Sequence, residues 1–207
     1  MQLTLVRHGR SLADDQARVE GGGWDAPLTV EGVRQANLLA ARFVSERYEC
    51  DVLYSSPLIR AAAVADILAT ALGGPAATLD ARLAELHLGR LSGLLISEAQ
   101  ERYPKPSGGV RSYVPLPGGE SHCDHVARVL SFYAELTDRH SDDRICVVAH
   151  GGTLSLLLQI IYGMPLWSPY LEGQWFRFRS GDTGVHRLTI AGHSVITHFL
   201  NDTSHLR

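Results

Sequence analysis

Apolar runs of strand length alternate with longer stretches of helical periodicity along most of the chain. Three apolar runs predict buried strands, at 2–7, 51–56 and 144–150. Five stretches with apolar residues at helical spacing predict helices, at 33–48, 58–72, 96–103, 124–140 and 152–163. Near the end of the chain, alternating apolar and polar residues predict three further strands, at 175–179, 185–190 and 194–200.

Local signals indicate where several of these elements begin and end. Thr29 is typical of a helix N-cap, and Pro57 suits the first turn of the next helix. The sequence Gly73-Gly74-Pro75 ends that helix. The stretch 79–95 has no clear period and is interpreted as loop, and residues 104–121, rich in Pro, Gly and Ser, as an irregular excursion.

The order of these elements predicts an α/β fold. Strands that alternate with helices favour a three-layer sandwich, with a mostly parallel sheet and helices on both of its faces. The last strands lie so close together in sequence that we expect them to join the sheet as antiparallel additions. We expect a single domain over residues 1–207, with an insertion at about 82–121.

Composition narrows the classes of function. The formal net charge of -3 argues against a general nucleic-acid-binding protein, and no apolar run approaches the length of about 18 residues that a membrane span requires. No signal peptide is visible, and Cys50, Cys123 and Cys146 are widely spaced without a CxxC pair. We therefore expect a cytoplasmic protein with reduced thiols.

Charged and polar residues follow the predicted parallel strands where ligands usually bind. The first strand ends in Arg7-His8-Gly9, the strand 144–150 runs into His150-Gly151-Gly152, and Arg60 lies in the first turn of the helix after 51–56. The carboxyl ends of parallel strands meet at one edge of the sheet, and the helix N-termini there favour anions. Arg7 and Arg60 could add forked contacts to phosphate oxygens.

Each of these residues also has an ordinary interpretation when it is taken alone. A histidine after a strand is more often a satisfied polar residue, and Arg60 or Glu85 alone would be a solvated surface group. Two His-Gly pairs at strand ends and an arginine at a helix start are a much rarer combination. Together they indicate a phosphate site.

Several segments along nearly the whole chain resemble the histidine phosphatase, or phosphoglycerate mutase-like, superfamily. The segments are LVRHGRS at the first strand, WDAPLTVEGVRQA, YSSPLIRAAAVA, LAELHLGRLSG, PGGES, VVAHGGTL and the ending LNDTSHL. The resemblance implies a phosphoglycerate mutase-like fold. It also implies that His8 is the phosphorylated nucleophile and Glu85 the proton donor, while Arg7, Arg60, His150 and Gly151 hold the phosphoryl group. No cofactor or metal is implied, because the arginines supply the positive charge.

The sequence departs from the family pattern beside the first motif. Arg10 stands where Glu or Gln is frequent, and Asp14 where Asn is frequent. A carboxylate at that position would repel phosphate unless Arg10 or Arg18 paired with it. Together with Trp24 and Tyr113, which could line the mouth of the site, Arg10 and Asp14 are the candidate substrate-binding residues.

The segment Ser121–His125 contains His122, Cys123, Asp124 and His125, which are all metal-ligand types. The favoured interpretation is a helix start, with Ser121 as the cap and Asp124 in the first turn, because no second cluster of ligands is evident. We therefore expect no metal.

Three functions remain open at this point. The leading one is a metal-independent phosphomonoesterase for small phosphorylated metabolites, and the others are a phosphoglycerate mutase and a catalytically weak phospho-ligand or phosphoprotein binding module. The complete set of candidate catalytic residues argues against the binding module. Family mutases carry a basic residue directly after the acid, where this chain has Leu86. Two features favour a mutase instead: the basic residues Lys105 and Arg111, and the segment VRSYVPLP, which resembles a basic, proline-rich stretch of the mutases. Leu86 decides for the phosphatase. A homodimer is suggested only by analogy.

Overall fold

A single six-stranded sheet runs through the molecule. The computed structural model describes residues 1–104, 112–166, 178–192 and 194–207. The strand order is β3-β2-β4-β1-β5-β6. The strands are β1 (Gln2–Arg7), β2 (Val52–Ser55), β3 (Thr78–Leu79), β4 (Arg144–Ala149), β5 (Val185–Ala191) and β6 (Ser194–Asp202). Strands β3, β2, β4 and β1 are mutually parallel, while β5 and β6 are antiparallel additions, as predicted.

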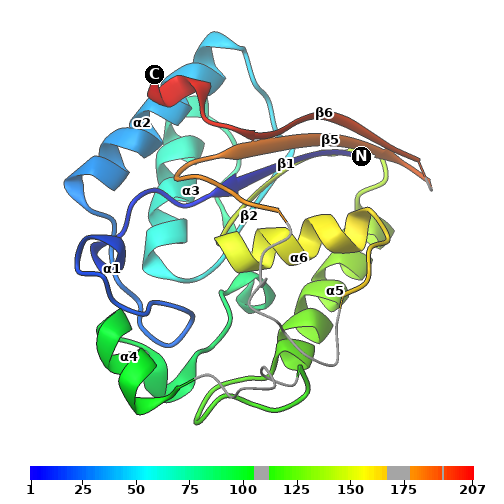
Figure 1. Ribbon diagram of the computed structural model, residues 1–207. Coiled ribbons are helices and arrows are strands. Elements are labelled where there is room, and N and C mark those ends of the chain that lie inside the picture. Colours follow the sequence, from blue (N-terminus) through cyan, green and yellow to red (C-terminus); the bar gives the residue numbers. More distant parts are fainter. Residues whose placement is uncertain (105–111, 167–177, 193) are drawn as a thin grey trace.

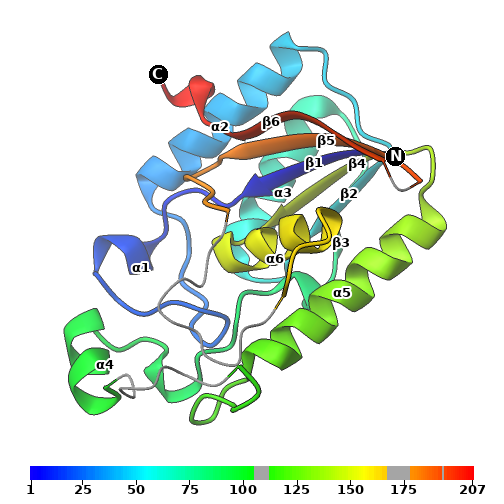
Figure 2. The ribbon, with the colours of Figure 1, turned by 45° about the vertical axis from the view of Figure 1, so that its right-hand side comes forward.

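Helices cover both faces of this sheet and complete the predicted three-layer sandwich (Figures 1 and 2). The helices are α1 (Leu12–Asp15), α2 (Val30–Ser45), α3 (Ile59–Leu72), α4 (Ile96–Arg102), α5 (His122–Arg139) and α6 (Gly151–Ile161). Helices α2 and α3 pack on one face, and α5 and α6 on the other. None of the helices within the described ranges has the length and apolar character needed to cross a membrane.

The alternation of residues along the central strands explains the two cores. Leu3 and Leu5 of β1 are fully buried against α5 and α6, whereas Val6 is buried against α2 and α3. Strand β4 divides in the same way, with Val147 on the first side and Val148 on the second. A strand buried on both faces reads as a continuous apolar run, which is the pattern of 2–7 and 144–150.

The predicted caps are confirmed, with one shift. The Thr29 hydroxyl accepts from the Gly32 N–H at 3.0 Å, and Gly73 ends α3 with a φ of 58°. Ser121 and Asp124 form a capping box at the start of α5. Pro57 lies just outside α3, because Leu58 is the N-cap and the helix begins at Ile59.

Two predicted segments differ in the structure. The stretch interpreted as loop at 79–95 begins within β3 and contains two 3₁₀ turns, Ala81–Leu83 and Gly89–Leu91. The predicted strand 175–179 lies mostly outside the described residues, and Phe178 and Arg179 are not in a strand. These two residues border the cavity described below.

Candidate active site

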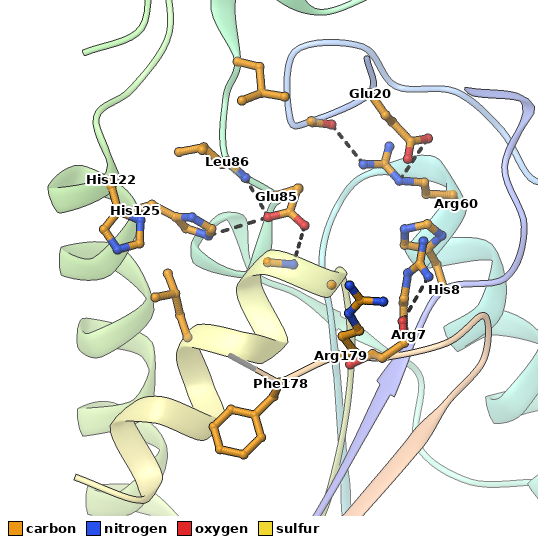
Figure 3. A pocket seen from close by; sticks show the side chains of 16 residues that line it. Arg7, His8, Glu20, Arg60, Glu85, Leu86, His122, His125, Phe178 and Arg179 are labelled. Carbon is orange, nitrogen blue, oxygen red and sulfur yellow. Dashed lines mark hydrogen bonds and ion pairs between the residues drawn. The ribbon is translucent and has the colours of Figure 1, made fainter. Parts of the chain in front are cut away.

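A cavity of about 630 Å³ opens beyond the carboxyl end of β1 and at the N-terminus of α6. Figure 3 shows its polar side chains directed toward one another from separate segments of the chain. The lining residues are Arg7, His8, Glu20, Gly21, Arg60, Glu85, Leu86, Leu88, His122, His125, Gly151, Gly152, Leu156, Phe178, Arg179 and Ser180. The structure thus brings Arg7, His8, Arg60, Glu85 and Gly151 together at one cavity.

His8 is held with one ring nitrogen engaged in a hydrogen bond. Its Nδ1 lies 2.7 Å from the Gly9 carbonyl oxygen, which can only accept, so Nδ1 carries the hydrogen and Nε2 carries the lone pair. Burial, followed by the charges of Arg7 and Arg60, lowers the pKa of His8 well below its usual value. The imidazole is therefore neutral at physiological pH, with Nε2 available as a nucleophile.

The two arginines enter the cavity from different elements. Arg7, at the end of β1, donates to the Ser180 carbonyl oxygen at 3.0 Å and pairs with Asp182 at 3.1 Å. Arg60, in the first turn of α3, is only 1% exposed and donates to the Gly21 carbonyl oxygen at 3.0 Å. Arg7 Nε and both Nε and Nη1 of Arg60 are buried and form no hydrogen bond with any described residue.

His150 lies beside His8, with the two ring centroids 5.0 Å apart. It is fully buried at the start of α6, and its Nε2 lies 2.7 Å from the Ser56 hydroxyl. Burial, together with the charges of His8, Arg60 and Arg7, lowers the pKa of His150 well below its usual value. Its Nδ1 is another buried atom without a hydrogen-bond partner among the described residues.

Glu85 lies on the opposite side of the cavity, held by two backbone groups. Its Oε1 accepts from the Leu86 N–H at 2.9 Å, and its Oε2 accepts from the Gly152 N–H at 2.7 Å. A Cβ at position 152 would lie 2.4 Å from Glu85 Oε1, so the carboxylate can approach the helix only because residue 152 is glycine. The acid is thereby fixed at the N-terminus of α6.

Arg128 of α5 places the segment that carries Glu85. Its guanidinium donates to the carbonyl oxygens of Arg82, Ala84 and Glu85 at 2.8, 2.6 and 3.0 Å. Its charge is paired with Glu120 at 2.6 Å. One side chain thus attaches an irregular segment to a helix, which explains how an acid on a loop can hold a fixed position.

The predicted substrate-binding residues Arg10, Asp14, Trp24 and Tyr113 do not line this cavity. Arg10 pairs with Asp15 at 2.5 Å, and Arg18 donates to the Gly93 carbonyl oxygen, so neither forms the predicted pair with Asp14. The Asp14 carboxylate instead accepts from the Ser11 N–H and hydroxyl as part of the capping box of α1. This use of Asp14 as a cap replaces the expected ion pair.

The two aromatic candidates also lie away from the lining. Trp24 packs near Arg18, whose guanidinium carbon is 6.0 Å from the ring centroid, and Tyr113 is 60% exposed. Contact of Arg10, Asp14, Trp24 or Tyr113 with a substrate therefore remains a prediction without support from the cavity. Lys105 and Arg111 lie outside the described residues.

Several lining residues were not anticipated from sequence. Glu20 lies in a glycine-rich loop, Phe178 and Arg179 precede β5, and none carries a sequence signal of its own. The histidines of α5 did carry a signal, because His122 and His125 are three residues apart and share the buried helix face.

These histidines contact different partners. His122 Nε2 lies 2.9 Å from the Leu166 carbonyl oxygen, and His125 Nε2 lies 3.1 Å from the Thr153 hydroxyl. Within the described ranges, no three His, Cys, Asp or Glu side chains are grouped so that they could hold a metal ion.

The chain is similar to known proteins in sequence and in fold. The sequence model of the family described as "Histidine phosphatase superfamily (branch 1)" matches residues 3–203. A Hydrogenobacter thermophilus protein named "Putative phosphoserine phosphatase 2" is 30% identical over 215 residues, which covers 100% of this chain and 98% of that protein. A 2,3-bisphosphoglycerate-dependent phosphoglycerate mutase of a Methylobacterium strain is 35% identical over 170 residues, or 78% of this chain and 81% of the mutase.

A solved structure gives the same result for the fold. A mycobacterial glucosyl-3-phosphoglycerate phosphatase in complex with VO3 aligns with a TM-score of 0.79 and 26% identity, covering 97% of this chain and 98% of that one. The chain is thus similar to both phosphatases and mutases, and the similarity in structure extends over almost the whole length.

Proposed function

Because the chain belongs to the histidine phosphatase superfamily, we propose that it is a metal-independent phosphomonoesterase that acts on small phosphorylated metabolites through a phosphohistidine at His8. The relatives of this chain support a phosphatase of the superfamily. The substrate class and the covalent mechanism rest on the site itself.

One observation carries the proposal: buried arginine nitrogens and one nucleophilic nitrogen lie at the same cavity, and His150 lies directly beside His8. Arg7 Nε, Arg60 Nε, Arg60 Nη1 and His150 Nδ1 are buried without a hydrogen bond to any described residue. The two Arg60 nitrogens have ion-pair neighbours, Glu20 at 3.3 Å and Asp25 at 3.7 Å, but no hydrogen bond. Buried polar groups without hydrogen bonds cost free energy, so their retention indicates a ligand with many acceptor atoms. A phosphoryl group offers three such oxygens and the negative charge that the arginines require.

The first step would be attack of His8 Nε2 on phosphorus. The new N–P bond forms as the bond from phosphorus to the ester oxygen breaks, and the departing oxygen takes a proton from the Glu85 carboxyl group. Negative charge spreads over the three equatorial oxygens during this transfer. The arginines, His150 and the backbone N–H groups at the start of α6 stabilise that charge without having to reorganise.

The second step would return the enzyme to its starting form. Water attacks the phosphohistidine, the N–P bond breaks, and the Glu85 carboxylate takes the proton from the attacking water. Glu85 is ionised at this point because it gave up its proton in the first step. The hydrogen bonds from Leu86 and Gly152 stabilise that carboxylate.

The wall beside Glu85 favours hydrolysis over mutase chemistry. Leu86 is 7% exposed, and it forms an apolar lining together with Leu88, Leu156 and Phe178. An apolar surface cannot bind the carboxylate and second phosphate of a bisphosphoglycerate, and it suits a substrate with an apolar or weakly charged body. A mutase is the second candidate function, because Arg179 also lines the cavity and because the chain has mutase relatives.

The test compares two reactions of the purified protein in the presence of a chelator. We expect release of inorganic phosphate from several monoesters, inhibited by vanadate, to be faster than interconversion of 2- and 3-phosphoglycerate. The variant His8→Ala should lose turnover and also the acid-labile phosphate label that the wild type acquires from a phosphate donor. Circular dichroism checks that this variant is folded.

Three outcomes contradict the proposal. Rapid interconversion with little phosphate release would identify a mutase. Near-normal activity of His8→Ala would exclude the covalent mechanism, and strict dependence on an added divalent metal would exclude metal independence.

A further inference from the structure

Glu20 is an acidic side chain inside the cavity that is proposed to bind an anion. It lies in the loop between α1 and α2, its side chain is only 16% exposed, and it lines the cavity together with Arg60 (Figure 3). The distance between Glu20 Oε1 and Arg60 Nε is 3.3 Å. Neither of these two buried atoms forms a hydrogen bond within the described residues.

Glu20 and a phosphoryl group would face the same guanidinium. Arg60 Nη2 is occupied by the Gly21 carbonyl oxygen, which leaves Nε and Nη1 for the cavity. Nε already has Glu20 as its neighbour, and Nη1 lies 3.7 Å from Asp25, whose side chain is 46% exposed. A dianionic phosphoryl group bound to Arg60 would thus meet a buried carboxylate at close range. Two anions in such a site repel each other strongly unless a proton intervenes.

We propose, on the basis of the function proposed above, that Glu20 takes up one proton from solvent when the dianionic phosphoryl group of the substrate binds. The ligand then enters as a dianion together with a proton, and the neutral Glu20 carboxyl can donate a hydrogen bond to a phosphoryl oxygen. Glu20 is thereby a determinant of ligand charge and of the pH range in which the site binds its substrate.

The surroundings of Glu20 make this proton uptake accessible near neutral pH. Burial raises the pKa of Glu20 to about 7, with a smaller contribution from Asp14, against the opposing effects of Arg60, Arg7 and a hydrogen bond with Ser11. The negative charges of Glu85, Asp25 and Asp14 also act on Arg60. A carboxyl group with this pKa is ionised in about half of the molecules at neutrality, before any ligand contributes further repulsion.

Sulfate is a suitable probe, because it is tetrahedral and stays a dianion throughout the neutral range. Its competitive inhibition constant against an aryl phosphate is measured from about pH 6 to about pH 9, with the thermal shift of the protein as a second measure of binding. We expect the affinity of the wild type to fall about tenfold for each pH unit above the Glu20 pKa, because one proton binds with each sulfate.

The variant Glu20→Gln keeps the size and hydrogen-bonding capacity of the side chain without the titration. It should bind sulfate with little pH dependence and about 30-fold more tightly than the wild type at about pH 8.5. The matched control is Asp25→Asn, which removes a negative charge beside the same arginine on an exposed side chain. It retains an oxygen for the Ile59 N–H, which donates a hydrogen bond to Asp25 at 2.8 Å. This variant should show the same pH dependence of sulfate affinity as the wild type.

Proton uptake by the unmodified protein is an independent measurement. Addition of sulfate to weakly buffered wild-type protein near pH 8 should raise the pH of the solution by close to one proton per site. Equal pH slopes for wild type and Glu20→Gln, or sulfate binding without proton uptake, would overturn the role of Glu20 while leaving the phosphatase intact. Absence of both sulfate binding and phosphatase activity would instead overturn the proposed function, and this inference with it.

Discussion

His8 and His150 are neighbouring buried histidines whose hydrogen bonds separate their roles. The Gly9 carbonyl fixes the hydrogen of His8 on Nδ1, so the lone pair on Nε2 faces the cavity. His150 uses Nε2 for Ser56 and leaves Nδ1 for a ligand. Burial keeps both rings neutral, and the nearby arginines add to this effect. The environment of His8, rather than histidine chemistry alone, therefore leaves a lone pair available at neutral pH, as the proposed nucleophile requires.

Glu85→Gln should reduce turnover most for esters with poor leaving groups. Glutamine keeps an oxygen for one backbone N–H but cannot donate a proton to the departing oxygen. For an alkyl phosphate we expect a loss of about 10²- to 10⁴-fold in kcat/KM, the usual contribution of general acid catalysis. A nitrophenyl phosphate, whose leaving group needs no proton, should lose much less in its first step.

The measurement is kcat/KM for a series of esters with leaving groups of different pKa, because this parameter reports steps up to the first irreversible one. Glu31→Gln, on the exposed surface of α2, serves as the control and should behave as the wild type. Equal losses of kcat/KM for alkyl and nitrophenyl phosphates would remove Glu85 from the acid role.

At the scale of elements, the strand-to-helix junctions could be predicted because their signals are local. The apolar runs of β1 and β4, the Thr29 cap and the capping box at Ser121 are each contained within a few residues. These junctions carry Arg7, His8, Arg60 and His150, which is why the sequence could group these four residues. Glu85 was identified through family resemblance, since its position depends on Arg128, 43 residues further along the chain.

Glu20 and Phe178 could not be predicted from sequence, because their positions also depend on contacts that are distant in sequence. Each lies on irregular backbone and reaches the cavity through tertiary packing, which leaves no periodic signal in the sequence. Asp14 shows the reverse case. Its position in the family pattern, where Asn is frequent, suggested a substrate contact, whereas helix α1 uses the carboxylate as a local cap.

The N-terminus of α6 provides a prediction at the scale of one element. Gly152→Ala would place a methyl group 2.4 Å from Glu85 Oε1, so the carboxylate must shift and its bond to the Gly152 N–H must weaken. We expect kcat/KM for alkyl esters to fall roughly 10²-fold, the cost of a displacement of about 1 Å at a catalytic group. Alanine favours the helix more than glycine does, so unfolding should not account for this loss.

Gly151→Ala is the matched comparison on the same helix turn. The nearest atom to its added Cβ would be Arg7 Nε at 3.9 Å, an ordinary van der Waals distance. Its loss of activity should therefore be smaller than that of Gly152→Ala, as measured by steady-state kinetics and by thermal unfolding of both variants. If the two variants lose activity equally, the contact between residue 152 and Glu85 is not what requires glycine.

For the whole molecule, the sheet separates two apolar cores and leaves its carboxyl edge for polar chemistry. The continuous apolar runs of β1 and β4 predict buried strands, and the order of strands and helices predicts the three layers. The structure shows that alternate residues of these strands enter the two cores. The two-residue strand β3 was missed because both of its residues are exposed and no apolar run marks it. The polar edge, by contrast, buries several histidines, and these connect the site to the stability of the fold.

Buried neutral histidines should make the protein sensitive to mild acid. The pKa values of His8, His125 and His150 are lowered well below the usual value by burial, and burial lowers the pKa of His186 to about 4. Below about pH 6.5 the unfolded chain binds protons at these residues while the native state does not. The free energy of unfolding therefore decreases as the pH is lowered. Each such histidine contributes up to about 1.4 kcal/mol per pH unit until its folded pKa is reached.

Glu20 has the opposite sign, because its pKa is raised to about 7. The contribution of Glu20 to the free energy of unfolding is fully present below its unfolded pKa and is lost as pH rises through about 7. Between about pH 6.5 and about pH 4.5 it therefore offsets the loss of stability caused by one histidine. Urea unfolding at several pH values should therefore show a net loss of stability across this window, with a steeper loss in Glu20→Gln. His186→Asn keeps an acceptor for the Asn201 N–H, bonded to His186 Nδ1 at 3.2 Å, and should show a shallower loss. A free energy of unfolding that stays constant or rises from about pH 6.5 to about pH 4.5 would mean that these histidines take up protons in the native state, which would also remove the basis for a neutral nucleophile at His8.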